Sequence, residues 1–467
     1  NIMVEDFNDD CKISVLEKIA EEFDGANTLF KFALLNRKPI IKKPYTKGNT
    51  QDTNIPIYDY IAMAKNLHMP ALYQCIESWY ESTRSPTIQP NDITDDDMRS
   101  EINNQFSRLF RKFIDSAYIK ECTFHESALN AAYPATLQHL NDLITARGDS
   151  LRYLNLGFFK CNDEGLNILA KECTTLETFK IKASDCSDKE LANFLRTQQK
   201  LTKLKIRDAV GMKETMDAIK TLSHSLVKLR ILNCDLENCT TPFTGIGDCT
   251  HLRSLYMRNI RFTKTTSLSQ LLMPIARCEF HNIDFSKTQL PVEVLTEIAK
   301  KSSTTLRRVH LIRPDNEVYI NLSAGIEALA QYAINLRHFE RNIHPSEVNS
   351  ICYFLDTIGQ SLETLEIDSN MDGHDMSNLI ECIGRKCSNL SVLNISSFEF
   401  NPDAFKVLIE GCSLLHTLVI CDSQSVNDRI LELLYHADVL QSLEILGCPN
   451  ISIEAIDRFQ KERKEIE

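Results

Sequence analysis

Basic side chains recur along this chain at a fixed spacing. Lys180, Lys205 and Arg230 follow one another at intervals of 25 residues, and Lys203 and Lys228 are separated by the same interval. Ammonium and guanidinium groups form charge-assisted hydrogen bonds with carboxylates and phosphates, so a regular row of them could bind an acidic or phosphorylated group. A regular row of side chains requires a repeated structural element to position it.

Motifs for nucleophilic catalysis, phosphate binding and metal-dependent hydrolysis are absent from the sequence. It contains no G-x-x-x-x-G-K-[ST], G-x-S-x-G, H-E-x-x-H or G-x-G-x-x-G segment. Cys234 with Cys239, and Cys382 with Cys387, have four residues between them but lack a second pair at zinc-binding spacing. The sequence therefore predicts no catalytic residue, no metal site and no cofactor, and we expect a protein that is not an enzyme.

A six-residue phrase, in its simplest form L-x-x-L-x-L, occurs twelve times from Leu151 onward. Its copies are LRYLNL, LETFKI, LTKLKI, LVKLRI, LRSLYM, IARCEF, LRRVHL, LRHFER, LETLEI, LSVLNI, LHTLVI and LQSLEI. Successive copies start 25, 25, 25, 26, 23, 31, 30, 26, 28, 25 and 25 residues apart. The last three letters alternate apolar and variable, as in a β-strand. A strand phrase with a period in the twenties indicates a leucine-rich-repeat solenoid.

The second half of each repeat changes to helical spacing. In the first repeat, Asp163 opens a segment with apolar residues at Leu166 and Leu169. Stacked strand–turn–helix units would form an α/β solenoid with parallel strands on the concave face and helices on the convex face. With a weaker copy at Ile119, we expect about 12–13 units over residues 119–467. An all-α region should precede them, with a helical module at 1–45 and a helical linker at 46–118.

The third and fifth letters of each phrase should face outward on the concave side. The aromatic and basic residues at these positions form a candidate partner-binding surface: Tyr153, Lys180, Lys203, Lys205, Lys228, Arg230, Tyr256, Arg277 and Arg308. Phrases two to seven hold seven basic residues and one acidic residue there, whereas phrases eight to twelve hold three Glu and no Lys or Arg. This segregation favours an acidic or phosphorylated protein partner. Lys-rich strands also oppose aggregation, which is the alternative explanation.

Composition argues against membrane and nucleic-acid partners. The net charge is −12, and two outward tyrosines are too few for a platform on which bases stack. No apolar run approaches the roughly 20 residues that span a bilayer. The first residues also lack the basic and apolar regions of a secretory signal.

The sixteen cysteines show a positional pattern of their own. Cys173, Cys249, Cys387 and Cys412 each lie three residues before the first letter of a phrase. One repeated slot suits a small residue that is buried as a free thiol. Reduced thiols of this kind predict a cytoplasmic or nuclear location.

The first full repeat continues as CNDEGLNILAKEC, from Cys161 to Cys173, and resembles the cysteine-containing repeats of F-box and ribonuclease-inhibitor-like proteins. The N-terminal segments FNDDCKISVLEKI and TLFKFALLNR resemble an F-box. The residues that match its apolar pattern are Phe7, Val15, Leu16, Ile19, Leu29, Phe30, Leu34 and Leu35. Asn8 replaces the F-box proline, and Pro39 stands where the tryptophan is expected.

The resemblance implies a substrate-recognition subunit of an SCF-type cullin–RING ubiquitin ligase. Its F-box would bind a Skp-type adaptor, and its repeats would hold a protein substrate. Two alternatives remain open. The N-terminal apolar pattern also suits a helical cap on the end of a solenoid. The whole chain could likewise be a stand-alone leucine-rich-repeat scaffold with no link to a ligase.

Overall fold

Of the 467-residue chain, the computed structural model describes residues 66–68, 73, 95–116, 119–125, 137–237, 239–262, 267–313, 321–369, 373–463 and 466. These residues fall into two compact units, the first ending at Ala209 and the second beginning at Val210. Each unit is a stack of strand–helix repeats, and the parallel strands and leucine-rich-repeat architecture expected from the sequence are confirmed.

The first unit contains a parallel sheet in the order β1-β2-β3-β4-β5. Its strands are β1 (Asn66–His68), β2 (Glu121–His125), β3 (Tyr153–Lys160), β4 (Thr178–Lys182) and β5 (Lys203–Arg207). Its helices are α5 (Asp95–Ser116), α6 (Leu137–Arg147), α7 (Asp163–Glu172) and α8 (Asp188–Thr197). The stretch expected as a helical linker therefore contributes strand β1 to the sheet in addition to helix α5.

The second unit contains a parallel sheet in the order β6-β8-β10-β11-β12-β13-β14-β15-β16, and a small sheet of β7 and β9. The strands of the large sheet are β6 (Lys228–Leu232), β8 (Ser254–Arg258), β10 (Asn282–Asp284), β11 (Arg308–Leu311), β12 (His338–Ile343), β13 (Thr364–Ser369), β14 (Val392–Ser396), β15 (Thr417–Cys421) and β16 (Ser442–Leu446). The small sheet consists of β7 (Asp235–Leu236) and β9 (Arg261–Phe262).

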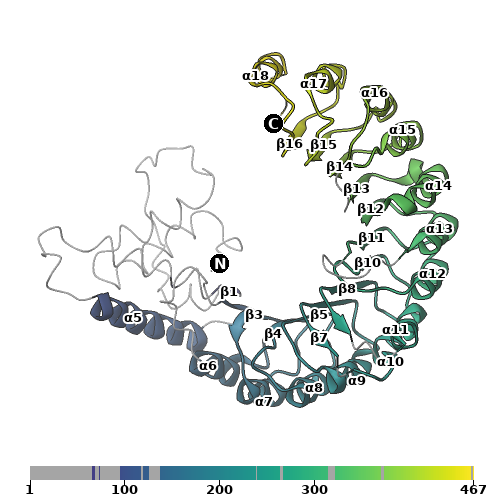
Figure 1. Ribbon diagram of the computed structural model, residues 1–467. Coiled ribbons are helices and arrows are strands. Elements are labelled where there is room, and N and C mark those ends of the chain that lie inside the picture. The colour runs from purple at the N-terminus through teal and green to yellow at the C-terminus, as the bar shows by residue number, and fades with distance from the viewer. Residues whose placement is uncertain are drawn as a thin grey trace, which may run out of the picture. The chain divides into compact units, whose positions relative to one another are not determined.

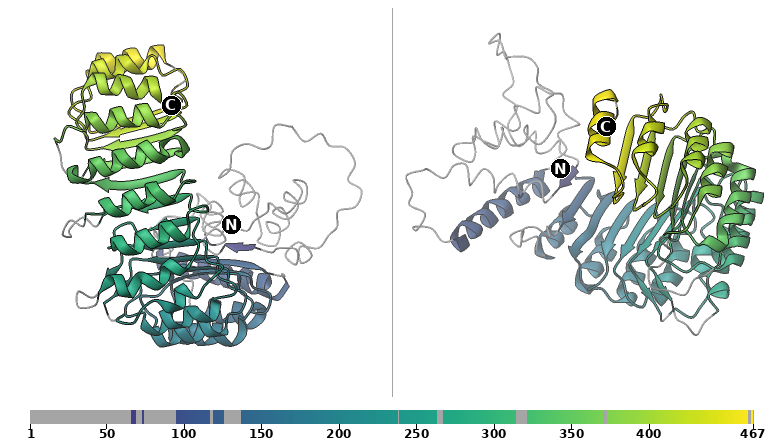
Figure 2. Two further views of the ribbon diagram at one scale, coloured as in Figure 1. Left: turned by 90° about the vertical axis from the view of Figure 1, so that its right-hand side faces the viewer. Right: turned by 45° about the horizontal axis from the view of Figure 1, so that its top comes forward.

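Helices connect the strands of the second unit and lie on its outer side, whereas the strands line the inner side of an arc (Figures 1 and 2). The α-helices are α9 (Lys213–Ala218), α10 (Thr244–Gly247), α11 (Leu268–Leu272), α12 (Val292–Lys301), α13 (Ser323–Tyr332), α14 (Val348–Ile358), α15 (Ser377–Lys386), α16 (Pro402–Gly411), α17 (Asp428–Leu434) and α18 (Ile453–Glu462). Short 3-10 helices are η2 (Ile219–Leu222), η3 (Met273–Arg277), η4 (Pro345–Glu347) and η5 (Gly359–Ser361).

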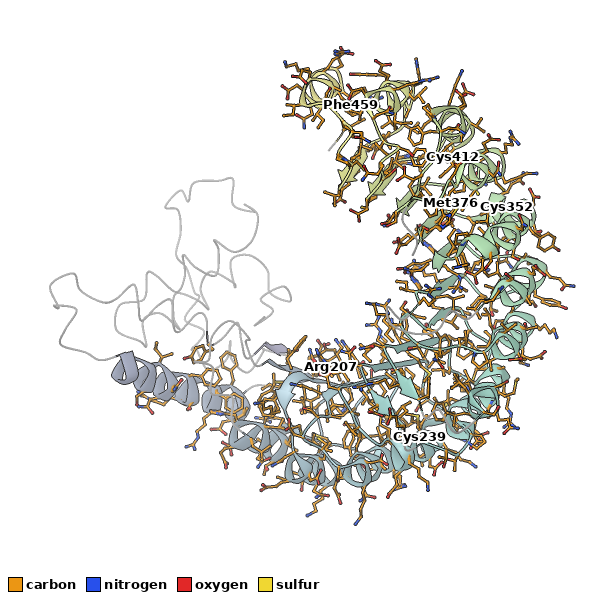
Figure 3. All side chains as sticks on the ribbon, viewed as in Figure 1. Arg207, Cys239, Cys352, Met376, Cys412 and Phe459 are labelled. Carbon is orange, nitrogen blue, oxygen red and sulfur yellow. The ribbon has the colours of Figure 1, made fainter. Side chains whose placement is uncertain are left out.

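The apolar letters of the phrase build the core between strands and helices. In the first full repeat Leu151, Leu154 and Leu156 are completely buried, and the apolar residues of α7 cover them from the other side. Strands β4 and β6 alternate between buried and partly exposed positions, as the period-two pattern requires. Side chains fill the space between the two layers (Figure 3). The variable letters are thereby directed away from the helices.

Strands β5, β6, β8, β14 and β15 are each followed by a residue with a left-handed backbone. Asp208, Asn233, Asn259, Ser397 and Asp422 have φ angles between 51° and 59°. Asn and Asp tolerate this conformation better than most residues because their short side chains can bond to nearby polar groups. The amide of Asn259 donates to the side-chain oxygen of Asn233 in the preceding repeat at 3.1 Å. This contact helps to set the spacing between neighbouring turns.

Candidate functional site

In the first unit, the outward side chains of three neighbouring strands bring the expected tyrosine and lysines together. Lys180 on β4 is in register with Asn155 on β3 and with Lys205 on β5. Thr178 on β4 is likewise in register with Tyr153 on β3 and with Lys203 on β5. The Lys180 ammonium donates to the Tyr153 hydroxyl at 2.7 Å and lies 4.9 Å from the centre of its ring. The tyrosine therefore holds one lysine of this row in place on the strand surface.

Arg207 and Phe158 also belong to this surface of the first unit. Both lie past the last letter of the six-residue phrase, so the phrase did not predict them. Arg207 is the last residue of β5, where alternation continues one step past the sixth letter. Its guanidinium lies 4.7 Å from the ring centre of Phe158, whose side chain is 43% exposed. Arg207 is also in register with Lys182 of β4 and lies on the strand side of its unit (Figure 3). Reading each strand one residue further would have found it.

In the second unit, two cations share one aromatic ring. Lys228 and Arg230 are outward residues of β6, and Tyr256 on β8 is in register with Arg230. The Lys228 ammonium lies 5.0 Å from the centre of the Tyr256 ring, and the Arg230 guanidinium lies 4.6 Å from it. The Nε atom of Arg230 is buried without a hydrogen-bond partner. We call Lys228, Arg230 and Tyr256 the basic surface. It can attract an anion because two positive charges lie side by side.

Arg277 does not belong to this surface, so that assignment was wrong. It ends the 3-10 helix η3, where it forms an ion pair with Asp248 at 3.8 Å. The strand of this repeat is β10, and its phrase is FHNIDF, which begins at Phe280. Phe280, Ile283 and Phe285 are buried and fill the three apolar positions. The earlier segment fitted the pattern because Ile275 and Cys278 are also buried, but Ile275 lies in the 3-10 helix and Cys278 directly follows it.

Asn282 and Asp284 therefore occupy the third and fifth positions of this phrase in place of Arg277 and Glu279. Asp284 is completely buried and forms an ion pair with Arg258 at the end of β8, whose side chain is about half exposed. The Asp284 carboxylate also accepts a hydrogen bond from the N–H of Ser286 at 3.0 Å. Arg258, like Arg207, lies one step past its phrase. This pair neutralises the strand next to the basic surface.

Further along the same sheet, acidic residues replace basic ones. Glu340 on β12 is in register with Glu366 on β13, and the imidazole of His310 on β11 contacts the Glu340 carboxylate. Burial, together with the negative charge of Glu340, raises the pKa of Glu366. Asp368, two residues along β13, accepts a hydrogen bond from Asn342 at 2.6 Å. We call Glu340, Glu366 and Asp368 the acidic surface.

Arg308 and His338 lie between the two surfaces. Each is the third letter of its phrase, and they are in register on β11 and β12. Burial and the nearby Arg308 guanidinium lower the pKa of His338, so its imidazole is neutral at neutral pH. Arg308 therefore supplies a positive charge between the two surfaces, and His338 adds none.

The slot cysteines lie in the core, as expected. Cys173, Cys249, Cys387 and Cys412 are at most 2% exposed. Burial is the main cause that raises the pKa of Cys173, Cys249 and Cys412 to about 12. The Cys249 thiol donates to the carbonyl of Gly245 at 3.3 Å. All fourteen cysteines within the described ranges are free thiols, and no group of three or more metal-binding side chains occurs there.

The expected adaptor-binding residues lie outside the part of the chain that the structure describes. These are Phe7, Val15, Leu16, Ile19, Leu29, Phe30, Leu34 and Leu35. Their assignment therefore rests on the sequence resemblance. Among the helices that are described, none is long and apolar enough to cross a membrane.

Comparisons with known proteins find similarity of fold. No protein-family model and no curated protein matches the chain. The crystal structure of the Rad7 and Elc1 complex in yeast aligns over 76% of this chain and 91% of the other, with 14% identity and a TM-score of 0.46. A leucine-rich-repeat protein of Leptospira interrogans aligns over 76% and 90%, with 18% identity and a TM-score of 0.36. An internalin from Listeria monocytogenes aligns over 76% and 87%, with 16% identity and a TM-score of 0.38.

Proposed function

We propose that the outward strand surface of the repeats binds an acidic or phosphorylated segment of a partner protein. The observation that carries the proposal is the basic surface, where Lys228 and Arg230 both lie against the ring of Tyr256. The ring restrains both side chains, which lowers the conformational entropy that an anionic partner must overcome to bind them. Lys180 on Tyr153 and Arg207 on Phe158 repeat this arrangement in the first unit.

We further propose that the chain acts as the substrate-recognition subunit of an SCF-type cullin–RING ubiquitin ligase. The support is the F-box resemblance of residues 7–37, which would bind a Skp-type adaptor, combined with a repeat surface suited to hold a protein substrate. In this role the chain is not an enzyme, because the ubiquitin transfer belongs to its partner subunits. A stand-alone repeat scaffold would use the same surface without an adaptor.

Two variants separate these roles, and each serves as the control for the other. Alanine at Leu16, Leu34 and Leu35 should abolish co-purification with a Skp-type adaptor, while binding of an acidic peptide to the repeats remains. Glutamate at Lys203, Lys205, Lys228 and Arg230 should abolish acidic-peptide binding, while the adaptor remains bound. Absence of the adaptor from the wild-type preparation would support the stand-alone scaffold.

A matched control tests whether position matters as well as charge. Lys213 begins α9 and Lys301 ends α12, and both are exposed on helices of the second unit. Glutamate at these two positions also reverses positive charges, but away from the strands. We expect this variant to bind the acidic peptide like the wild type. A loss equal to that of the strand variant would mean that net charge alone governs binding.

A further inference from the structure

The sheet of the second unit changes the sign of its surface charge along the row of fifth phrase letters. The row begins with Arg230 and Tyr256 on β6 and β8, and it reaches Glu340 and Glu366 on β12 and β13. Asp284, which stands between them, is buried and neutralised by Arg258. Two charged surfaces of opposite sign are therefore separated by β10, where the charge of Asp284 is compensated, and by β11, which carries Arg308.

Two carboxylates of the acidic surface, those of Glu340 and Glu366, repel one another. Glu340 and Glu366 are in register on neighbouring strands, and like charges in this relationship repel one another. His310 contacts Glu340, but no lysine or arginine of the described residues forms an ion pair with Glu366. The raised pKa of Glu366 is consistent with this arrangement. A positive group supplied by a partner would relieve the repulsion.

The strand order fixes how far apart the two surfaces lie. From β6 to β13 there are five steps across the sheet, through β8, β10, β11 and β12. Neighbouring strands are separated by roughly 4.8 Å, so five steps span about 24 Å. An extended peptide advances about 3.3 Å per residue and covers this span with about seven residues. The two surfaces can therefore contact one short segment.

We propose that the partner segment is dipolar: a carboxylate or phosphate group binds Lys228 and Arg230, and a Lys or Arg about seven residues away binds Glu340 and Glu366. This inference rests on the proposed binding of an acidic segment and adds a second requirement to it. A polyanion such as a nucleic acid, or a uniformly acidic peptide of this length, would bring negative charge onto the acidic surface. The dipolar segment avoids that repulsion, so both surfaces contribute to specificity.

The test uses fluorescein-labelled synthetic peptides and the full chain, with affinity measured by fluorescence anisotropy. The dipolar peptides carry two phosphoserines and two arginines, separated by a Gly/Ser spacer that matches the span, in both orders. In an all-acidic peptide aspartates replace the arginines. We expect a dipolar peptide in one order to bind about tenfold more tightly than the all-acidic peptide.

The decisive variants change one surface at a time. Glu340→Gln with Glu366→Gln should weaken the dipolar peptide and strengthen the all-acidic one, and misfolding cannot produce opposite effects on two probes. Lys228→Glu with Arg230→Glu should weaken both peptides. Lys213→Glu with Lys301→Glu should change neither.

Several results would overturn the dipolar segment. The proposal fails if the dipolar and the all-acidic peptides bind with equal affinity. It also fails if neither peptide binds at concentrations up to about 1 mM. Tighter binding of a labelled single-stranded oligonucleotide would assign the surface to nucleic acid. When the two affinities are equal, the change of Lys228 and Arg230 to glutamate separates the two proposals. If it still weakens binding of the all-acidic peptide, only the requirement for a positive group at Glu340 and Glu366 is overturned, and the proposed binding of acidic segments stands.

Discussion

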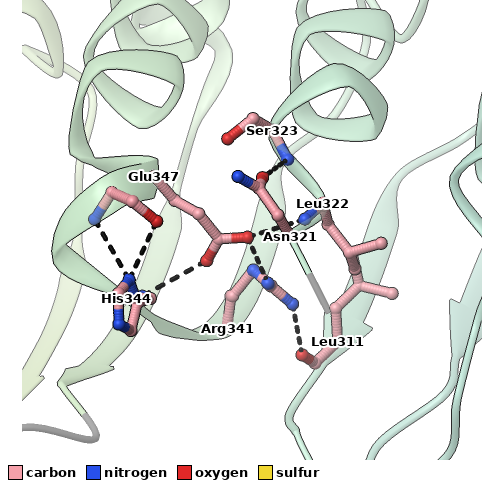
Figure 4. A network of polar contacts seen from close by, with 8 residues as sticks. Leu311, Asn321, Leu322, Ser323, Arg341, His344 and Glu347 are labelled. Carbon is pink, nitrogen blue, oxygen red and sulfur yellow. Dashed lines mark hydrogen bonds and ion pairs between the residues drawn. The ribbon is translucent and has the colours of Figure 1, made fainter. Parts of the chain in front are cut away.

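Arg341 and Glu347 form an ion pair at 2.7 Å in the interior of the second unit, with side chains that are 2% and 0% exposed. The Glu347 carboxylate also accepts hydrogen bonds from the N–H groups of Leu322 at 2.8 Å and His344 at 3.2 Å (Figure 4). Arg341 donates to the carbonyl of Leu311 at 3.2 Å. The pair thereby connects two neighbouring repeats, because Leu311 and Leu322 belong to the repeat of β11 and α13, whereas Arg341 and Glu347 belong to that of β12 and η4.

Glu347→Ala should destabilise the protein by about 3–5 kcal/mol, because it leaves the buried Arg341 guanidinium without its partner. Replacing both residues with leucine should cost less, since no uncompensated charge then remains. Urea denaturation followed by circular dichroism would compare the midpoints of the two variants with that of the wild type. A double variant that unfolds at lower urea than Glu347→Ala would contradict this explanation.

Asp284→Asn should make the protein less stable and the basic surface more attractive to anions. The amide side chain can still accept the hydrogen bond from Ser286, but the charge that neutralises Arg258 is lost. We expect a cost of about 1–3 kcal/mol in unfolding free energy. Binding of the all-acidic peptide should strengthen, with an effect that fades as salt is raised. Unchanged affinity at low salt would show that Arg258 does not act on this surface.

Glu366→Gln should stabilise the protein at neutral pH. Burial and the Glu340 carboxylate raise the pKa of Glu366 in the folded state, so the folded protein binds this proton more tightly than the unfolded chain. The resulting stability is present below the unfolded pKa and is lost as pH rises through the folded pKa. His310 and the side chain of Asn394 oppose the shift, and the group is only half-buried.

Solvent screening therefore keeps the expected gain from Glu366→Gln below about 1 kcal/mol. Thermal unfolding of both proteins at pH 7 and at pH 4 would measure it. The gain should be present at pH 7 and shrink at pH 4, where the wild-type carboxyl is largely protonated. A gain of equal size at both values would assign the effect to packing.

The slot cysteines should resist alkylation until the protein unfolds. With the pKa of Cys173, Cys249 and Cys412 raised to about 12, only about one thiol in 10⁴ is ionised at pH 8. Iodoacetamide treatment followed by peptide mass spectrometry, with and without urea, would measure their reactivity. Cys186, which is only partly buried, provides the internal comparison. Modification of the slot cysteines at the rate of Cys186 in the native protein would contradict the burial argument.

Much of the fold could be predicted because leucine-rich repeats use local patterns. The alternation in LETFKI predicts strand β4, and the helical spacing after Asp163 predicts α7, since each pattern reports which side of a short element is buried. The candidate surface was less predictable. Arg207 and Arg258 lie one residue past the phrase, and the exact length of a strand depends on pairing with its neighbour.

The six-residue phrase predicted the wrong strand in one repeat, where two segments matched it equally well. IARCEF and FHNIDF overlap, and both place apolar residues at the required spacing. Pairing with β8 and β11 selects the second, since only its residues 282–284 continue the register of the sheet. This choice removes Arg277 from the surface and introduces Asp284, so the charge of the central strands differs from the expectation.

By itself the sequence determined the repeat, its parallel strands, its buried thiols and the alternation that sends Lys228 and Arg230 outward, because these depend on spacing within one unit. Tertiary structure alone decided which charges meet. Lys228 and Arg230 share Tyr256, Arg258 finds Asp284, Glu340 faces Glu366, and Arg341 is buried against Glu347. Most of these contacts join residues about 26 positions apart. Only the stacking of one repeat on the next brings such residues within contact distance.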